Sequence, residues 1–328
     1  MGKKSIIAVT LLMVLFTGLS CGSDEPETGP DIMFRDRGLP TPDFSAENTF
    51  QFIERQLEFG PRVPSTQSHW NTRNFLMDTL RGFAGDDRVF AQDFTQVVYG
   101  DTLRMSNIIA VFNPEASDRV LLCAHWDTRP RADNDPDPAR RDEPIPGADD
   151  GASGVAVLLE LARLMSEEMP RVGVDIILFD GEDYGHENDL DHYFLGARYW
   201  TQNPPVPGYS PRFGILLDMV GGENALFPKE GYSMAYASRV VDEVWSIAAD
   251  KGYDDLFLNE RGRAIADDHW ILNQSGLPTI NIIHQARDGD GWNFPPYWHK
   301  HADDIDIIDK SVLQRVGDVL VELLYNRM

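Results

Sequence analysis

Cysteine and positive charge are both scarce in this sequence of 328 residues. It contains only two cysteines, Cys21 and Cys123, so a disulfide framework is excluded. Lysine and arginine total 29 against 53 aspartates and glutamates, which gives a formal net charge of −24. A chain this acidic would be repelled by nucleic acid and by anionic bilayers over most of its surface. Both classes of partner are therefore excluded.

The N-terminal segment has the features of an export signal. Lys3 and Lys4 precede an apolar run over residues 5–19, which ends in small residues before Cys21. The run is shorter than the ~20 apolar residues that a membrane-spanning helix needs, and polar residues follow it at once. We therefore predict a signal peptide over residues 1–20 and an exported protein.

The residues around Cys21 predict a lipid anchor. The run Gly18-Leu19-Ser20-Cys21 resembles the cleavage site of bacterial lipoproteins, at which the cysteine is lipidated and becomes the mature N-terminus. Such sites usually carry leucine where Gly18 stands, so secretion with an unmodified Cys21 is the alternative. Residues 21–44 are rich in Gly, Pro, Ser and acids, which is typical of a solvated tether. We expect a periplasmic or cell-surface monomer whose only membrane contact is this anchor.

The pattern beyond the tether predicts one continuous catalytic domain over residues 45–328. Helical periods occur at residues 45–59, 68–83, 154–165, 195–202, 238–251 and 311–326. Strand-like runs occur at residues 88–98, 107–112, 120–124, 174–179, 213–218 and 279–283. This alternation predicts an α/β fold with a mixed, mostly parallel central sheet and helices on both faces, in which the early strands pair antiparallel.

Polar residues gather where the predicted strands end. The groups are His125-Trp126-Asp127, Asp180-Gly181-Glu182-Asp183, Asp218, the loop from His284 to His299, and Asp149-Asp150 ahead of the helix at 154–165. Each group alone could be a helix cap, a solvated turn or a structural histidine. Ligands of open α/β sheets bind beyond the carboxyl ends of the strands, and carboxylates that converge there repel one another unless a cation lies among them. Their joint occurrence therefore predicts a metal site.

The types of side chain in these groups indicate which metal they bind. Imidazole and carboxylates without thiolate suit zinc with an open fourth position, as in a catalytic site. Of the adjacent acids Glu182 and Asp183, one can bind the metal while the other moves protons at the substrate. Cys123 is expected to be a buried strand residue with no redox role.

Several short motifs resemble the zinc aminopeptidase superfamily and, within it, the glutaminyl cyclases. They are His125-x-Asp127, Asp150-Gly-Ala-Ser-Gly, Glu182-Asp183, Leu217-Asp218-Met219, Asp267-Asp268-His269, and Trp298-His299 followed by Asp303. The resemblance covers essentially everything after residue 45. It implies a three-layer sandwich of the zinc aminopeptidase, phosphorylase/hydrolase-like type.

The resemblance also implies roles for individual residues. In a cyclase, Asp150, Asp183 and His299 would hold one zinc ion, Glu182 would be the base, and Asp218 and Asp267 would belong to a hydrogen-bonded proton network. In an aminopeptidase, a second zinc would bind His125 and Asp218, with Asp150 bridging the two ions. Animal cyclases carry Glu at the position of Asp183, so the carboxylate here is set back by one methylene.

Two features favour a cyclase over a peptidase. The run from His125 to Pro130, continued by residues 132–136, resembles bacterial cyclases, and Trp298 precedes His299 where peptidases usually carry Tyr. A dry aromatic pocket would favour attack by the substrate's own amine over attack by water. Candidate wall residues are Trp292, Phe294, Tyr297 and Trp298, together with Tyr193, which stands where bacterial cyclases carry Trp. Aromatic residues in such a loop could also serve only to pack it.

The implied activity is that of a zinc-dependent glutaminyl-peptide cyclotransferase. It would convert the N-terminal Gln of peptides or proteins into pyroglutamate and release ammonia, with Glu182 moving the proton and Trp298, Tyr193 and Trp292 contacting the substrate. The alternative enzyme is a zinc aminopeptidase in which Glu182 activates water. A third possibility is an acidic surface-binding lipoprotein without chemistry, against which the intact Glu182 argues.

Overall fold

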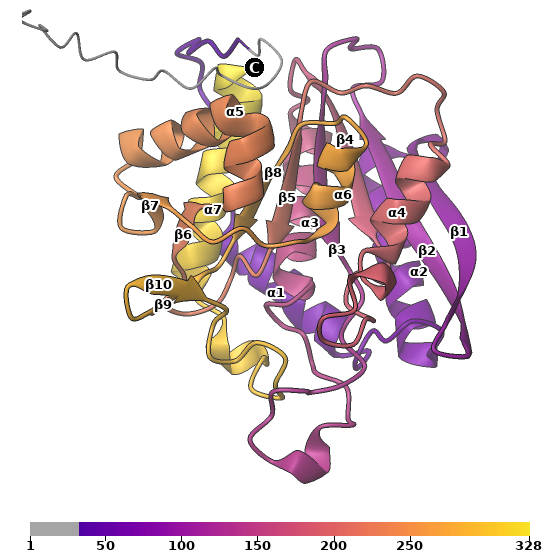
Figure 1. The fold of residues 1–328 in the computed structure, drawn as a ribbon. Helices are drawn as coiled ribbons and strands as arrows, with labels where there is room; N and C mark the ends of the chain where they lie inside the picture. The colour runs from indigo at the N-terminus through magenta and orange to yellow at the C-terminus, as the bar shows by residue number, and fades with distance from the viewer. Residues whose placement is uncertain (1–32) are drawn as a thin grey trace, which may run out of the picture.

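A six-stranded sheet forms the centre of the protein, as seen in a computed structural model that describes residues 33–328 (Figure 1). The predicted signal peptide, Cys21 and the tether up to residue 32 lie outside the described residues. Within residues 33–328, none of the helices combines the length and the apolar content that a membrane crossing requires.

The strand order of the sheet is β1-β2-β4-β3-β5-β8. The strands are β1 (Val89–Val98), β2 (Asp101–Phe112), β3 (Arg119–His125), β4 (Gly173–Phe179), β5 (Gly214–Asp218) and β8 (Thr279–Ile283). β2 pairs antiparallel with both β1 and β4, whereas β4, β3, β5 and β8 run parallel. The carboxyl ends of these four strands therefore lie side by side along one edge of the sheet. This confirms the predicted mixed, mostly parallel sheet with antiparallel early strands.

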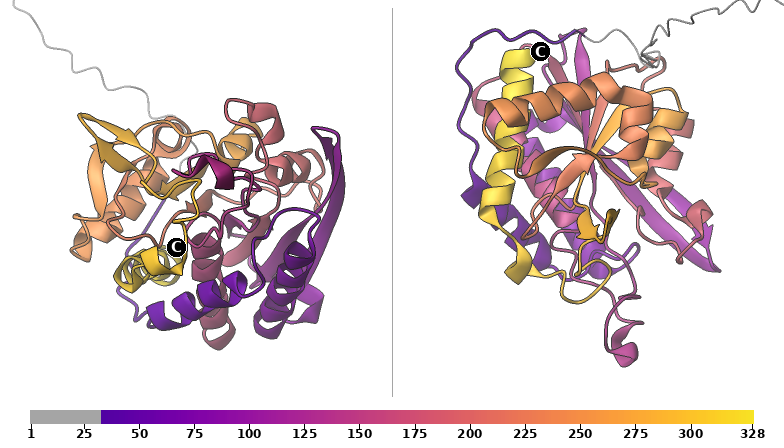
Figure 2. Two further views of the ribbon diagram at one scale, coloured as in Figure 1. Left: turned by 90° about the horizontal axis from the view of Figure 1, so that it is seen from below. Right: turned by 60° about the vertical axis from the view of Figure 1, so that its left-hand side comes forward.

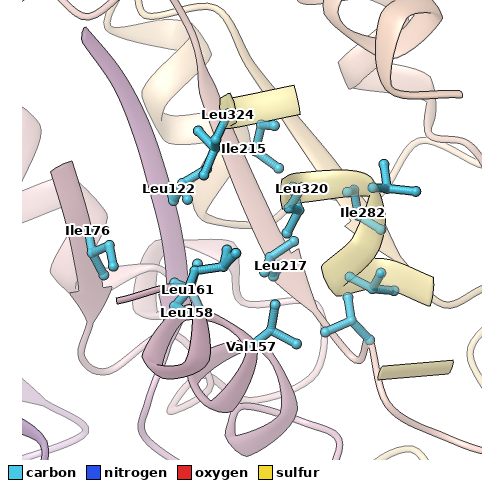
Figure 3. Packing of buried hydrophobic residues seen from close by; sticks show 14 of the residues in the cluster. Leu122, Val157, Leu158, Leu161, Ile176, Ile215, Leu217, Ile282, Leu320 and Leu324 are labelled. Atoms are coloured by element: carbon cyan, nitrogen blue, oxygen red, sulfur yellow. The ribbon is translucent and has the colours of Figure 1, made fainter. Parts of the chain in front are cut away.

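Helices cover both faces of the sheet. Those on one face are α1 (Ala46–Leu57), α2 (Gln67–Ala84), α3 (Ala152–Glu167), α5 (Gly231–Asp250) and α7 (Lys310–Glu322), and those on the other are α4 (Leu195–Gln202) and α6 (Asp268–Gln274). Alternate strand residues face the two layers: Leu122 packs in the larger core with Leu158 and Leu320 (Figure 3), while Cys123 packs in the smaller core with Trp200. The observed layers follow from burial of apolar side chains on both faces.

Several elements differ from the pattern-based prediction. Helix α5 begins seven residues before the predicted start at 238, because the backbone is non-helical at Ala237 and this kink interrupts the apolar period. Strand β2 begins at Asp101 and not at 107, because it pairs with β1 over its full length. Short elements that the sequence did not predict are α6, β6 (Phe227–Lys229), β7 (Phe257–Arg261), β9 (Ala286–Asp288), β10 (Gly291–Asn293) and the 3-10 turns Asp86–Arg88, Pro138–Arg140, Leu190–His192 and Ile305–Ile307. The helix predicted over 311–326 is observed, but its end, Leu323–Arg327, is π-helical.

Two glycines bring α3 against the edge where the parallel strands end. A Cβ on Gly154 would lie 2.3 Å from the backbone oxygen of Leu217. Gly151 has a φ of +99°, and a Cβ there would lie 2.7 Å from the backbone oxygen of Asp127. Glycine at both positions lets the loop containing Asp150 approach the ends of β3 and β5. From the same edge, the loop that carries the turn Pro138–Arg140 projects away from the body of the protein (Figure 2).

Candidate functional site

Five buried side chains converge at the carboxyl ends of the parallel strands. His125 ends β3 and Asp218 ends β5, while Asp183 follows β4. Asp150 lies just before α3, and His299 lies in the loop between β10 and α7. These are the five residues that the sequence marked as candidate metal ligands, and the structure brings them together from five separate segments.

Asp150, Asp183 and His299 form a group that fits a metal ion. Their potential ligand atoms all lie within 4.8 Å of one another. The Nε2 atom of His299 is 3.4 Å from Asp183 Oδ1 and 3.9 Å from Asp150 Oδ2. Asp150 Oδ2 and Asp183 Oδ2 are buried, yet neither has a hydrogen-bond partner among residues 33–328. Such atoms are costly to bury alone, and a cation shared with His299 would satisfy both.

His125, Asp150 and Asp218 form a second group with the same spacing of ligand atoms. Here the imidazole already joins the carboxylates: His125 Nε2 is 3.1 Å from Asp150 Oδ1 and 3.3 Å from Asp218 Oδ1. Burial alone would lower the pKa of His125, but hydrogen bonds to Asp127, Asp150 and Asp218 raise it well above its usual value. In the second group Nε2 of the imidazole thus lies against both carboxylates, although His125 Nδ1 has no hydrogen-bond partner among residues 33–328. The unpartnered Asp183 Oδ2 belongs to the first group alone, and Asp150 is shared by both groups.

Glu182 faces the cavity beside these groups. Its backbone N–H donates to Asp127 Oδ1 at 3.0 Å, and that of Asp183 donates to Asp127 Oδ2 at 3.2 Å. One buried carboxylate thus fixes the turn that presents both acids. Burial raises the pKa of Glu182 well above its usual value, although nearby His125 opposes the shift. A carboxyl group with a raised pKa can both take up and return a proton near neutral pH.

Asp218 and Asp267 add two more acids to the cavity wall. Asp267 caps α6, and its Oδ2 accepts a hydrogen bond of 2.6 Å from Asn281 Nδ2. Burial raises the pKa of both carboxyl groups. Asp267 is in neither potential metal group. It therefore adds a proton-holding carboxyl group beside Glu182 and Asp218.

An aromatic wall stands beside the acids. The cavity has a volume of about 420 Å³, and its aromatic lining residues are Tyr193, Phe194, Tyr232, Phe294 and Trp298. The ring of Trp298 stacks on His299 with centroids 3.6 Å apart, and Phe294 stacks on Trp298 at 3.9 Å. These stacked rings place an apolar, water-excluding surface against one of the candidate metal ligands.

The backbone is strained where this site is built. Four non-glycine residues at or next to the cavity have a left-handed backbone: Asn188 with φ +67°, Phe194 with φ +59°, His299 with φ +56°, and Met219, which follows Asp218, with φ +50°. Such conformations cost of order 1 kcal/mol each and persist when the surrounding structure imposes them. Their number at the cavity is consistent with a functional site.

Two aromatic residues that were candidates for the cavity wall, Trp292 and Tyr297, lie elsewhere, and so does His301, a histidine close to His299 in the sequence. Trp292 does not line the cavity, because its ring lies under the Arg287 guanidinium on the β9–β10 hairpin and its Nε1–H donates to the Arg261 carbonyl at 3.0 Å. Tyr297 is buried behind the site, where its hydroxyl donates to Asp149 Oδ2 at 2.6 Å. His301, the rival of His299 by nearness in sequence, is bound to Asp135 at 2.8 Å. Trp292 is therefore not part of the cavity wall, contrary to the expectation, and its contact with a substrate stays a prediction.

Arg129 lies in the motif that begins at His125, but no role was predicted for it. Its guanidinium is buried, donates to Asp183 Oδ1 at 2.6 Å, and lies 5.6 Å from the ring centroid of Tyr193. The ion pair leaves Asp183 Oδ2 as the oxygen without a partner. Arg129 thus orients Asp183 toward His299, which no local pattern could reveal.

Glu230 is a second buried charged residue that the sequence analysis missed, and it binds the backbone of Ile265, which lines the cavity. It lies before α5 and accepts hydrogen bonds from the backbone N–H groups of Ser233 and Ile265, and it is 3.1 Å from His269 Nε2. Burial alone would raise its pKa, but the bonds with His269 and Ser233 outweigh this and lower the pKa from 4.5 to about 2. Glu230 is therefore ionised in the folded protein across the neutral range.

We expect Glu230→Gln to lower the free energy of unfolding at pH 7 by about 3 kcal/mol, from a pKa difference of about 2.5 units at 1.36 kcal/mol each. Because the folded pKa is depressed, this stability is present above pH ~4.5 and is lost as the pH falls toward 2. Urea denaturation at pH 7 and pH 3 measures it. The exposed Glu260, paired with Arg287, is the control, and Glu260→Gln should leave stability nearly unchanged because solvent screens this surface pair. Equal effects of the two substitutions at pH 7 would contradict the assignment.

Comparison with known proteins places this geometry in a family. The model of peptidase family M28 matches residues 107–324. A glutaminyl cyclase of Bacteroides thetaiotaomicron, solved with N-acetylhistamine bound, is 43% identical with a TM-score of 0.84 over 88% of this chain and 100% of that chain. A Zn-dependent exopeptidase of Parabacteroides distasonis matches with the same identity, TM-score and coverage. The glutaminyl-peptide cyclotransferase of Bos taurus is 24% identical over 291 residues, 79% of this chain and 76% of the bovine one. The proteins that this chain resembles therefore include glutaminyl cyclases and a Zn-dependent exopeptidase.

Proposed function

The chain belongs to peptidase family M28, and we propose that within this family it is a glutaminyl-peptide cyclotransferase. It converts the N-terminal glutamine of peptides into pyroglutamate and releases ammonia. A glutaminyl cyclase and an exopeptidase are each 43% identical to this chain, so family membership alone does not distinguish the two activities. The arrangement of side chains at the site supports the cyclase.

The single observation that carries the proposal is the unpartnered oxygen on each of Asp150 and Asp183, the two carboxylates that lie beside His299. With His299, these residues would hold one zinc ion, whereas His125 Nε2 already lies 3.1 Å from Asp150 Oδ1 and 3.3 Å from Asp218 Oδ1. A bound zinc ion supplies Lewis-acid polarisation of a carbonyl group. An aminopeptidase with two ions would need the His125 group for its second metal. One zinc beside a proton-holding carboxyl cluster is the arrangement that a cyclase requires.

The reaction then needs only proton movement and positioning from the protein. Glu182 takes a proton from the substrate's α-amine, whose nitrogen forms a bond to the carbon of its own γ-carboxamide. The bond from that carbon to the amide nitrogen breaks, and Glu182 returns the proton so that ammonia leaves. Asp218 and Asp267 line the same cavity and orient the departing group. No water is consumed, and atoms and charge balance within the substrate.

The aromatic wall favours this internal attack. Trp298 and Tyr193 line the cavity beside His299 and would contact the glutamine side chain, with Phe294 stacked behind Trp298. Exclusion of water from the pocket suppresses the competing hydrolysis of the carboxamide or the peptide bond. The carboxyl cluster can retain the proton between its removal from the amine and its delivery to ammonia, whereas a hydrolase needs only one base to activate water.

The test compares two products. We expect ammonia release and pyroglutamyl peptide from Gln-peptides, and no free amino acid from Leu-peptides under the same conditions. Enzyme-coupled ammonia detection and peptide mass spectrometry measure both. Turnover of Leu-peptides alone would replace the proposal with the aminopeptidase. If neither Gln-peptides nor Leu-peptides are turned over, a non-enzymatic binding protein would be favoured.

The same proposal includes an exported, lipid-anchored monomer. It rests on the sequence around Cys21, which lies before the described residues, and on the acidic tether that follows. We expect the full-length protein to sediment with membranes in a bacterial host and Cys21→Ser to appear in the soluble exported fraction. Cys123→Ser, at the chain's other cysteine, is the control and should stay with membranes. Equal distribution of wild type and Cys21→Ser would disprove the anchor.

A further inference from the structure

Arg263 stands at the mouth of the cavity with an open guanidinium. Within residues 33–328, it is the only arginine or lysine among the residues that line this cavity. It is exposed, and neither an ion pair nor a hydrogen bond joins its guanidinium to another described residue. Arg287, by contrast, is exposed outside the cavity and pairs with Glu260 at 2.7 Å. Arg263 therefore offers its full set of donors to a ligand.

The side chain of Gln285 holds the backbone of Arg263 in place. Its N–H donates to Gln285 Oε1 at 2.8 Å, and its carbonyl accepts from Gln285 Nε2 at 3.3 Å. Gln285 follows strand β8 and is fully buried, so this clamp connects the mouth of the cavity to the central sheet. The carbonyl also accepts from the N–H of Gly231 at 3.2 Å. Such pre-organisation lowers the entropy cost of binding through this side chain.

Arg263 is also the outermost member of a stack that begins at the metal site. His299 stacks on Trp298 at 3.6 Å and Trp298 on Phe294 at 3.9 Å, and the Arg263 guanidinium lies 5.3 Å from the Phe294 centroid. A peptide in extended form advances ~3.3–3.6 Å per residue. With its N-terminal residue beside His299 and Trp298, the peptide would therefore bring its next residue along Phe294 toward Arg263.

From this geometry we infer that Arg263 binds a carboxylate of the peptide beyond its N-terminal glutamine. The guanidinium fork matches a carboxylate in two parallel hydrogen bonds, and the aromatic ring beneath it holds the fork in place. The carboxylate is either an acidic side chain at the second residue or the C-terminus of a dipeptide. This inference rests on the proposed function, of which it specifies the substrate class. Arg263 is thus a specificity-determining residue and takes no part in the chemistry.

Four peptides test the inference in matched pairs. Gln-Glu-amide is compared with Gln-Gln-amide, and Gln-Gly with its C-terminal amide Gln-Gly-amide, which separates a side-chain carboxylate from a terminal one. For the wild type we expect KM to be roughly five- to tenfold lower for the acidic member of at least one pair. One charge-assisted hydrogen bond at an exposed site would give a difference of this size. The value of kcat should differ by no more than about twofold. Arg263→Met should remove the difference and Arg263→Lys should restore part of it. Arg287→Met, which loses an arginine stacked on Trp292 outside the cavity, should leave the difference intact.

Failures of the two proposals are distinguishable. If Gln-peptides are cyclised with equal KM for both members of both pairs, or if Arg263→Met retains the difference, the carboxylate role is overturned and the cyclase remains. If no Gln-peptide is cyclised, the proposed function fails. The carboxylate site is then decided by calorimetry of the same four peptides with Glu182→Gln protein. Tighter binding of an acidic member that Arg263→Met abolishes supports the site, and equal binding within both pairs overturns it.

Discussion

Replacing Glu182 with glutamine is expected to lower kcat for Gln-peptide cyclisation by about two to four orders of magnitude, the usual range for a lost general base. Glutamine has nearly the same shape, so the turn fixed by Asp127 and the cavity should stay in place. It cannot take a proton from the α-amine. Because Glu182 is outside the Asp150–Asp183–His299 group, the variant should keep its zinc. Steady-state ammonia release and metal analysis of the same sample measure both effects.

Glu143→Gln is the matched control for this variant. Glu143 is an exposed carboxylate that pairs with Arg140 on the projecting loop and does not line the cavity. Its replacement should leave kcat within about twofold, as expected for a solvated surface group. Full activity of Glu182→Gln would show that another group moves the proton. Loss of zinc from that variant would instead make Glu182 a ligand and would require a different base.

Substitution of His299 or Asp183 is expected to have the second large effect. His299→Gln and Asp183→Asn should each weaken zinc binding by at least about a hundredfold, because even loss of a group behind a metal ligand costs ten- to a hundredfold. Cyclisation should fall with the bound zinc. Both variants keep side-chain volume, and circular dichroism spectra that match the wild type would separate metal loss from unfolding. Inductively coupled plasma mass spectrometry of the dialysed protein gives the zinc content per chain.

The same measurement counts the zinc ions. We expect one per chain in the wild type, and still one in His125→Gln, because His125 joins Asp150 and Asp218 by hydrogen bonds. His301→Gln, which loses a histidine bound to Asp135 outside the cavity, should also keep its zinc. Two ions in the wild type, reduced to one in His125→Gln, would match the dinuclear arrangement of an aminopeptidase and contradict the single-zinc site.

Much of the fold could be predicted because its strands are apolar runs with clear ends. Strand β8 and helix α4 have the bounds that the sequence predicts, since each is bordered by loop residues and supplies an apolar face to the sheet. Helix α6 and the two-stranded pairs β6–β7 and β9–β10 could not be predicted. They are three to seven residues long, too short for a period to appear, and tertiary contacts stabilise them.

Some residues of the site could likewise be predicted from the sequence, and others could not. Of the residues in the two potential metal groups, His125, Asp183 and Asp218 end or follow strands of the sheet, so the sheet edge suffices to predict that these three meet. Asp150 before α3 and His299 in a loop join them at that edge. Trp292 was wrongly placed because the β9–β10 hairpin turns its ring toward Arg287, which depends on pairing that the sequence does not show. Arg129 and Glu230 were missed because isolated charged residues indicate a solvated surface. Their roles come from partners more than thirty residues away.

The most direct test of the account is cyclisation in water enriched in oxygen-18. Closure of the ring uses the substrate's own amine, so the pyroglutamyl product should carry no label and should retain every residue of the starting peptide. Mass spectrometry of the products reads both features at once. A peptide shortened by its first residue, with labelled oxygen in the released amino acid, would show that water is the nucleophile and would contradict the cyclase.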